Sequence, residues 1–260
     1  MIPTDDSTFA PGIRLLPGEV REDVRKLYSL LRIIDDLVDE GHEGAPDHVE
    51  AVALWARGEP HVATAETRAL ADLALRHPLS RDALLSFCEG MRHDIARAGI
   101  DTEEELELYC QRVGGSVGIL LANILGSDGQ EAHAKIAALG RAVQRTNILR
   151  DIDEDLSRGQ IYIACTTIER FGFPSPGARE ELLRDQIRRA DELYVEGFQA
   201  MPLLRRGQRA TRLSALLYRE ILRQIEREGF GRRAGRVIVP AWRQRALHAK
   251  QLLHQLNRST

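Results

Sequence analysis

The sequence has few cysteines and no excess of positive charge. Only three cysteines occur in 260 residues, Cys88, Cys110 and Cys165. An odd number at such wide spacing matches neither a disulfide framework nor a paired zinc site, so we expect a protein of the reducing cytoplasm. The chain carries 36 Lys and Arg against 39 Asp and Glu, a net charge of -3. Because it lacks a bulk positive charge, we expect no binding to nucleic acid.

Long apolar runs and a leader-like beginning are also lacking. The longest apolar run, Ile119 to Leu125, is interrupted by Asn123 and is far too short to span a bilayer. Residues 1–9 contain Asp5 and Asp6 and no apolar stretch, so we expect no signal peptide. Peripheral contact with a membrane stays open, because release of a lipid-like product would require it.

No segment alternates apolar and polar residues as a strand does, and no repeat or long polar linker divides the chain. Apolar residues recur instead at helical spacing, first on a stripe that includes Val24, Leu31 and Val38 and ends near Gly41. We expect one all-α domain over residues 1–260, a helical bundle around a central cavity. The further helices are predicted at about 47–57, 63–77, 80–98, 102–126, 129–158, 178–201, 206–229 and 240–256.

Carboxylates lie at helical spacing in two places. Asp35 and Asp39 are four residues apart, so they share one face of the first long helix with apolar neighbours. A second polar stripe steps by four along the 129–158 helix, beside another stripe of alternating charge that could brace it through ion pairs. The polar stripe contains Asn147, Asp151 and Asp155, with Gln144 one turn earlier. The stripe of alternating charge contains Arg150, Glu154 and Arg158.

Acidic helical faces are most often solvated surface, and that reading remains the alternative here. Both acidic stripes border apolar residues, however, so part of each should point inward, where an unpaired carboxylate needs a proton, a cation or a metal. Oxygen ligands of this kind suit Mg²⁺, which fills its other positions with water and phosphate oxygens. A diiron site would need Glu-x-x-His on two helices, and no Glu has a His three residues later.

These motifs resemble those of the squalene and phytoene synthases, the head-to-head prenyl transferases. Residues 28–39 look like the family's first motif, Y-x-x-x-R-x-x-D-D-x-x-D, and residues 144–162 like its second, Q-x-x-N-x-x-R-D-x-x-E-D-x-x-R-G-R-x-Y, with one mismatch. Between them, residues 90–94 match a G-M-x-x-D element and residues 109–118 match Y-C-x-x-V-A-G-x-V-G. Residues 218–226 resemble the family's late helix. The resemblance runs from about Phe9 to Val237.

The resemblance implies a class I terpenoid-synthase-like bundle in which the two aspartate motifs face each other and bind two or three Mg²⁺ ions. It implies metal ligands at Asp35, Asp39, Asn147, Asp151 and Asp155. The residues that it implies for substrate diphosphate are Arg32, Gln144, Arg150, Arg158 and Tyr162, and those for catalysis are Tyr28, Arg32 and Tyr109. Asp94 is a further candidate. For Tyr109 a plain core tyrosine is the alternative, and for the glycine pair Gly114 and Gly118 the alternatives are close helix packing or room for a prenyl chain.

The activity implied is an Mg²⁺-dependent transfer that joins two farnesyl or geranylgeranyl diphosphates head to head, by a monomer or a homodimer. Four departures favour an alternative, a terpene cyclase that ionises one prenyl diphosphate. Ser7 stands where the family has a basic residue, Gln160 where it has Arg, Gly114 where it has Ala and Ala164 where it has Pro. A non-catalytic assembly factor is a third reading, which the retained aspartates oppose. No Gly-rich dinucleotide turn supports NADPH, although the family does not use one.

Overall fold

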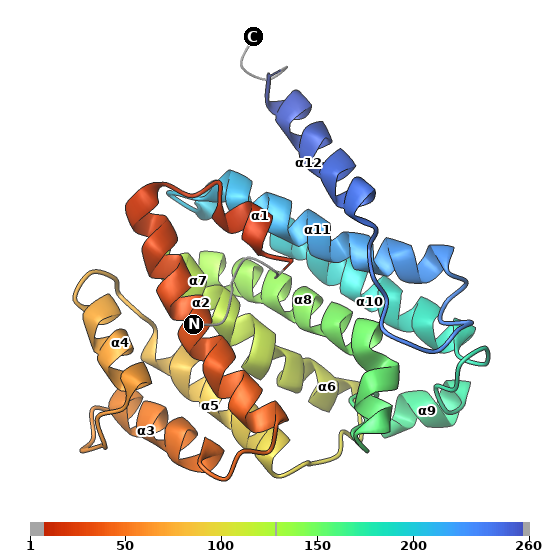
Figure 1. Cartoon of the computed structure of the whole chain (residues 1–260), viewed down its shortest axis with the longest axis horizontal. Helices are drawn as coiled ribbons and strands as arrows, with labels where there is room; N and C mark the ends of the chain where they lie inside the picture. Colours follow the sequence, from red (N-terminus) through yellow and green to blue (C-terminus); the bar gives the residue numbers. More distant parts are fainter. Residues whose placement is uncertain (1–7, 128, 257–260) are drawn as a thin grey trace.

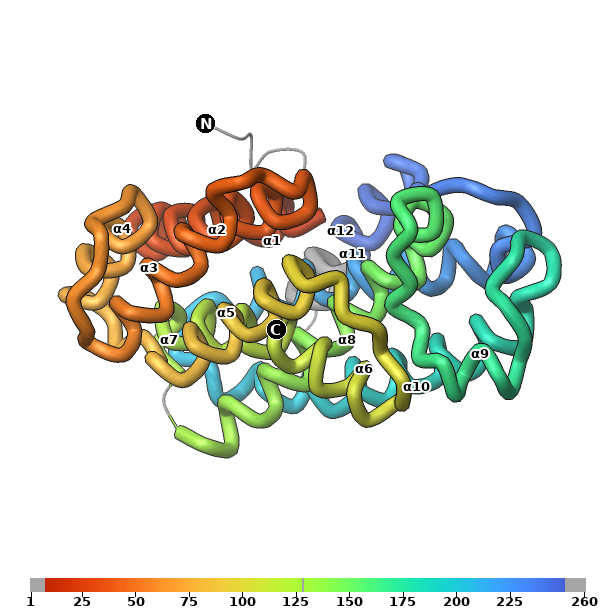
Figure 2. The backbone as a smooth tube through the Cα atoms, turned by 90° about the horizontal axis from the view of Figure 1, so that it is seen from below, coloured from red at the N-terminus to blue at the C-terminus, as the bar shows by residue number. Residues whose placement is uncertain are grey.

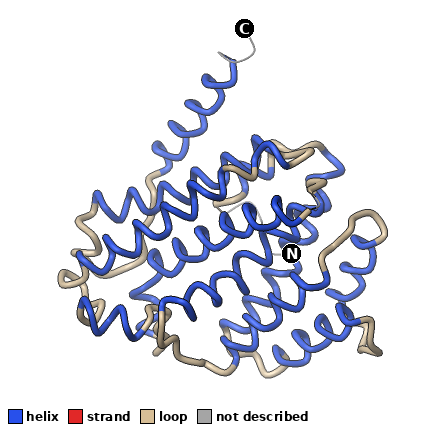
Figure 3. The backbone as a smooth tube through the Cα atoms, turned by 180° about the vertical axis from the view of Figure 1, so that it is seen from behind, coloured by secondary structure: helices blue, strands red, loops and turns tan. Residues whose placement is uncertain are grey.

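The computed structural model describes residues 8–127 and 129–256, and the side chains of 8–127 and 129–250. It is a layered arrangement of helices with no strand in that part of the chain (Figures 1 and 3). In chain order the elements are α1 (Ala10–Ile13), α2 (Gly18–Asp39), α3 (Ala45–Arg57), α4 (Ala65–Ala74), α5 (Arg81–Ile95), α6 (Glu103–Cys110), the π-helical segment η2 (Gln111–Gly115), α7 (Ser116–Ile124), α8 (Gln130–Ser157), α9 (Cys165–Phe171), α10 (Glu180–Phe198), the 3₁₀ turn η3 (Met201–Leu203), α11 (Gln208–Arg227) and α12 (Ala241–Leu256).

Local signals start and stop these helices. Thr64 caps α4 and Thr102 caps α6, each in a reciprocal capping box, and Ser80 accepts a hydrogen bond from the third amide of α5. Helix α3 begins with Pro46 in its first turn and ends at Gly58, whose positive φ of 77° suits glycine. Because the caps satisfy terminal amides that would otherwise lack partners, the helix bounds follow from the sequence to within a few residues.

Helix α8 is the centre of the bundle. It packs against α6, η2, α7, α10 and α11, and its buried residues lie on several faces rather than on one stripe. Helix α2 lies in the front layer in Figure 1, while α3 and α4 lie at one end of the molecule and α9 lies at the other (Figure 2). The core runs through the whole bundle, and no helix in the described residues is both long and apolar enough to cross a membrane.

The all-α prediction is confirmed, with three differences in detail. The predicted helix 102–126 is interrupted by the π-helical segment η2, which contains Gly114 and Gly115. The short elements α1, α9 and η3 were not predicted, because four, seven and three residues are too few to show helical periodicity. Helix α12 leaves the bundle at its upper edge, which apolar spacing alone does not indicate (Figure 1).

Candidate active site

A large cavity lies between α2, α8 and α11. It contains about 1280 Å³ of empty space, part of which is open to solvent. Its wall is mainly apolar, with side chains from α1, α2, α5, α7, α8 and α11: Ile13, Leu16, Val24, Leu31, Phe87, Val117, Leu121, Leu125, Ile136, Leu139, Val143 and Ala215.

Glycines allow the backbones to touch along one wall of this cavity. A Cβ on Gly114 would lie 2.3 Å from the carbonyl oxygen of Gly140, and one on Gly118 would lie 2.9 Å from that of Ile136. The η2–α7 segment therefore packs directly on α8, and a π-helical turn in such a place is typical of functional sites. Close helix packing is therefore confirmed at Gly114 and Gly118. Both glycines also line the cavity, and room for a prenyl chain stays a prediction.

One end of the cavity is polar. Tyr28, Arg32 and Asp35 reach it from α2, and Gln144 and Asn147 reach it from α8. The Oδ1 atom of Asn147 is buried and accepts no hydrogen bond from the described residues, while its amide contacts Gln144. Along α8 the wall extends from Ile136 to Asn147, about 17 Å at 1.5 Å per residue. The cavity therefore has a long apolar wall and a polar end, its mouth.

The α2 carboxylates at this mouth are costly to ionise. Asp35 has 28% of its side chain exposed, and desolvation, together with the charge of Asp39, raises its pKa to about 7 against the opposing charge of Arg32. Asp39 lies at the exposed end of α2, yet desolvation still raises its pKa, and so does the charge of Asp151, while Arg32 and Arg158 oppose the rise. A bound cation would remove this cost.

The α8 carboxylates face those of α2. Desolvation raises the pKa of Asp155 to about 7, and the negative charges of Asp151 and Asp39 contribute to the rise. Asp151 accepts a hydrogen bond of 2.8 Å from Arg150 Nε. Since the charge of Asp151 raises the pKa of Asp39 and the charge of Asp39 raises that of Asp155, the two motifs lie close to each other. No three Asp, Glu, His or Cys side chains in the described residues are close enough to hold an ion by themselves.

Next to the acidic residues lies a buried carboxylate between two tyrosines. The side chain of Asp94 accepts hydrogen bonds from Tyr109 Oη at 3.2 Å and Tyr162 Oη at 3.1 Å, and the two rings stack 5.1 Å apart. Burial raises the pKa of Asp94 to about 7, the tyrosines lower it, and Asp35 and Asp39 raise it further. Tyr109 and Tyr162 thus point at Asp94, and neither is among the residues that line the large cavity.

The segment between α11 and α12, residues 228–240, crosses the acidic end of α8 as a strap. Arg236 Nε lies 3.1 Å from Asp151 Oδ1, and the backbone amide of Val237 donates to the carbonyl of Arg150. Asp153, on the other side of α8, holds the same strap through the amide of Gly235, and it also pairs with buried Arg179 at 2.7 Å. No role was predicted for Arg236, because the residues next to it in the sequence do not indicate the path of a non-helical segment.

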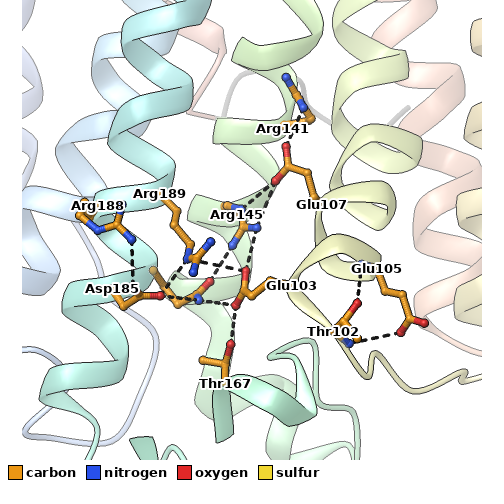
Figure 4. A network of polar contacts seen from close by, with 11 residues as sticks. Thr102, Glu103, Glu105, Glu107, Arg141, Arg145, Thr167, Asp185, Arg188 and Arg189 are labelled. Carbon is orange, nitrogen blue, oxygen red and sulfur yellow. Dashed lines mark hydrogen bonds and ion pairs between the residues drawn. The ribbon is translucent and has the colours of Figure 1, made fainter. Parts of the chain in front are cut away.

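Arg145 anchors α8 on the side away from the cavity. Its guanidinium is 4% exposed and lies 3.1 Å from both Glu103 and Glu107 of α6, and it donates to Gln186 of α10 at 2.7 Å (Figure 4). Glu103 in turn accepts from Thr167 of α9. Each charge in this buried group has an opposite partner, so the group fixes α8 against three neighbouring helices.

Aromatic rings stand beside the polar mouth. The ring of Phe9 lies 5.6 Å from that of Tyr28 and 4.5 Å from that of Tyr218, and all three residues line the cavity. Such faces attract a cation. Phe9 and Tyr218 belong to elements of the family resemblance, although neither was assigned a role from the sequence. Ser7, where the family has a basic residue, lies outside the described residues.

The predicted site residues thus fall into three groups. The cavity mouth contains Tyr28, Arg32, Asp35, Gln144 and Asn147. Beside it are the remaining carboxylates Asp39, Asp151 and Asp155, with Arg150 bound to Asp151. Of the others, Tyr109 and Tyr162 are directed to Asp94, and Arg158 is exposed and pairs with Glu154 at 2.8 Å.

Comparison with known proteins gives consistent matches. The family model for squalene/phytoene synthase matches residues 2–243. A phytoene synthase of Thermus thermophilus is 35% identical, covering 95% of this chain and 88% of that protein. A presqualene diphosphate synthase of Zymomonas mobilis is 29% identical, covering 86% of this chain and 81% of that protein.

Solved structures agree on the fold. A dehydrosqualene synthase in complex with ligand superimposes with a TM-score of 0.86 at 24% identity, covering 98% of this chain and 94% of that one. A squalene synthase from Alicyclobacillus acidocaldarius gives 0.73 at 27% identity, covering 86% and 89%. The predicted fold and the predicted class of prenyl transferase are confirmed. With acidic motifs that converge at the mouth of an apolar cavity and a family match over nearly its whole length, the chain belongs to the squalene/phytoene synthase family.

Proposed function

We propose that this protein joins two C15 or C20 prenyl diphosphates head to head, through a cyclopropylcarbinyl diphosphate, with Mg²⁺ bound between the α2 and α8 motifs. The observation that carries the proposal is the cavity, with its long apolar wall and a mouth at which two sets of carboxylates meet. An amphipathic substrate with an apolar chain and a polyanionic head matches both parts.

The oxygen ligands at the mouth fit magnesium. Asp35, Asp39, Asp151 and Asp155 would hold two or three ions. The neutral ligand would be Oδ1 of Asn147, which accepts no hydrogen bond from the part of the chain that the structure describes. Because the protein side chains alone do not complete an ion site, substrate oxygens and water would supply the remaining ligands, as is usual for Mg²⁺. When bound, the ions supply positive charge that neutralises the departing diphosphate.

The residues of the chain then have distinct tasks. Arg32 lies at the mouth and Arg150 lies beside it, where they can hold diphosphate oxygens. Arg158 extends this positive edge into solvent. Heterolysis of the allylic C–O bond leaves the electron pair on diphosphate and a cation on the prenyl chain. The rings of Phe9, Tyr28 and Tyr218 can stabilise that cation, and the apolar wall keeps water from capturing it.

The second prenyl diphosphate supplies the electrons for the new carbon bond. Its C2–C3 double bond attacks C1 of the cation, which leaves a tertiary cation at C3. Loss of a proton from the C1 that carried the first cation then closes the cyclopropane ring. This step needs two chains in one cavity, and an apolar wall that runs about 17 Å along α8 supports the requirement. Among the relatives are phytoene synthases and a presqualene diphosphate synthase, so both chain lengths belong in the test.

The test is incubation with farnesyl or geranylgeranyl diphosphate and Mg²⁺, followed by mass spectrometry of dephosphorylated, extracted products. We expect a product with twice the substrate's carbon number. Asp82→Asn, which changes an exposed aspartate of α5, serves as the matched control for substitutions at the mouth. A product of unchanged carbon number would indicate the cyclase instead, and no product from either substrate would contradict both enzymatic readings.

A further inference from the structure

The C-terminal helix is separate from the bundle. Helix α12 begins at Ala241, contacts α11 near its base, and then projects away from the other helices (Figures 1 and 3). Its link to the body includes Arg243, whose Nη1 lies 3.7 Å from Glu220 of α11. Most of the described side chains of this helix, over residues 241–250, are exposed, so its own sequence indicates what covers it.

One face of α12 is apolar and exposed. Trp242 is 63% exposed, and Ala246 and Ala249 are exposed on the same face at spacings of four and three residues. The sequence continues this spacing with Leu253 and Leu256. Ile238, just before the helix, is 72% exposed. An exposed tryptophan at the start of an apolar stripe is unfavourable in water and favourable at a membrane interface.

The charge around this face has one sign. After Glu228 the sequence contains seven Arg or Lys and no acidic residue. At 100° per residue, Arg245 lies about 60° from Trp242 on one side of the stripe and Lys250 lies about 80° from it on the other. Both are exposed. A basic helix with an apolar stripe that begins at a tryptophan is typical of segments that lie in the interface of an anionic membrane.

We propose that α12 is a membrane-docking helix whose partner is an anionic bilayer surface. Trp242 and the apolar stripe enter the interface, while Arg245 and Lys250 contact lipid phosphates. Pairing with α12 of a second copy is less favourable, because it would bring two uniformly basic segments together. The strap places this helix close to the site, since α12 begins five positions after Arg236, which contacts Asp151. Docking would therefore hold the acidic mouth near the surface from which prenyl lipids come and to which their products go.

The test is sedimentation of the full-length protein with vesicles of phosphatidylcholine alone or mixed with phosphatidylglycerol. We expect binding to the anionic vesicles that weakens as NaCl is raised, and little binding to phosphatidylcholine. Each basic residue near an anionic surface contributes about 1 kcal/mol, or about fivefold in partitioning. Arg245→Glu combined with Lys250→Glu should therefore lower binding by at least about 25-fold.

The matched control makes the same charge change at the other end of α11. Arg206→Glu with Arg209→Glu replaces two exposed arginines there and should leave vesicle binding unchanged. Trp242→Ala tests the apolar face separately and should lower binding several-fold without altering net charge. Circular dichroism and thermal unfolding check that each variant keeps the fold, and vesicle binding requires no turnover, so the result does not depend on the proposed reaction.

Three results would overturn the proposal. The first is no binding of the unaltered protein to anionic vesicles at low salt, and the second is equal loss in the α12 and control variants. The third is dimerisation that the α12 substitutions abolish while vesicles are not bound, which would make a second copy the partner of this helix.

Discussion

Replacing Asp94 by Asn should reduce the pH dependence of stability. Asp94 is 7% exposed, and burial is the main reason that its pKa is raised from 3.8 to about 7. A shift of about 3 units corresponds to about 4 kcal/mol at about 1.4 kcal/mol per unit, taken as an upper limit. Asn keeps the size and the polar contacts to Tyr109 and Tyr162 but cannot ionise.

The sign follows from proton binding. Because the pKa of Asp94 is higher in the folded protein than in the unfolded chain, the folded state holds more protons between pH 3.8 and about 7. The stabilisation from protonated Asp94 is therefore complete below pH 3.8 and is lost as the pH rises through about 7. About two of the three pKa units lie between pH 5 and 7. As the pH rises across that interval, this residue alone should therefore lower the free energy of unfolding by about 2–3 kcal/mol.

The assay is urea unfolding at pH 5 and pH 8.5 with EDTA present, for the unaltered protein, Asp94→Asn and the surface control Asp82→Asn. Asp94→Asn should match the unaltered protein within about 1 kcal/mol at pH 5 and exceed it by about 2–3 kcal/mol at pH 8.5. Asp35 and Asp39 lie near enough to raise its pKa, so part of the gain comes from relief of their repulsion. Equal pH slopes in Asp94→Asn and the unaltered protein would refute the reasoning.

Three further predictions concern the metal motifs, the glycine contact and the buried arginine. Asp35→Asn or Asp151→Asn should lower turnover at least about 100-fold in a standard assay with Mg²⁺ while thermal unfolding shows an intact fold, because each removes an oxygen anion from the proposed metal site; full activity would contradict that site. Gly114→Ala should lower the melting temperature by several degrees, since its Cβ would lie 2.3 Å from a backbone oxygen, whereas Gly18→Ala, with nothing within 4 Å, should not. Arg145→Met should cost about 3–5 kcal/mol in urea unfolding, because it leaves buried glutamates without a cation, and a loss below about 1 kcal/mol would mean that water already compensates them.

The two acidic motifs could be predicted because their geometry is local. Residues four apart on a helix share a face whatever the helix packs against, so the pairing of Asp35 with Asp39 and of Asp151 with Asp155 follows from the sequence alone. Their convergence across the cavity depends on tertiary packing, and only the family resemblance indicated it. The same holds for Asp94: its spacing gives no sign that tyrosines from α6 and from the loop after α8 donate to it.

The strap that brings Arg236 to Asp151 could not be predicted, for a physical reason. Helix α11 ends in a short run with positive φ at Gly229, Phe230 and Gly231, so the chain leaves the helix in a direction that helical periodicity does not describe. Its path is then fixed by contacts far away in the sequence, such as the amide of Gly235 on Asp153. Segments of this kind take their position from the helices that they cross, so the sequence of the strap alone does not predict its path.

Helix α8 shows most clearly what separates the predictable part from the rest. Gln144 and Arg145 are adjacent in sequence, and helical geometry places them about 100° apart around the axis. Only packing decides that Gln144 lines the cavity while Arg145 enters the network with Glu103 and Glu107. A helix with one apolar stripe would have indicated its inner face, but α8 is surrounded on several sides, so burial no longer distinguishes core from site. The distinguishing feature is the partner. The buried charge of Arg145 is paired with glutamates, whereas the buried oxygen of Asn147 has no donor among the described residues and remains available to a ligand.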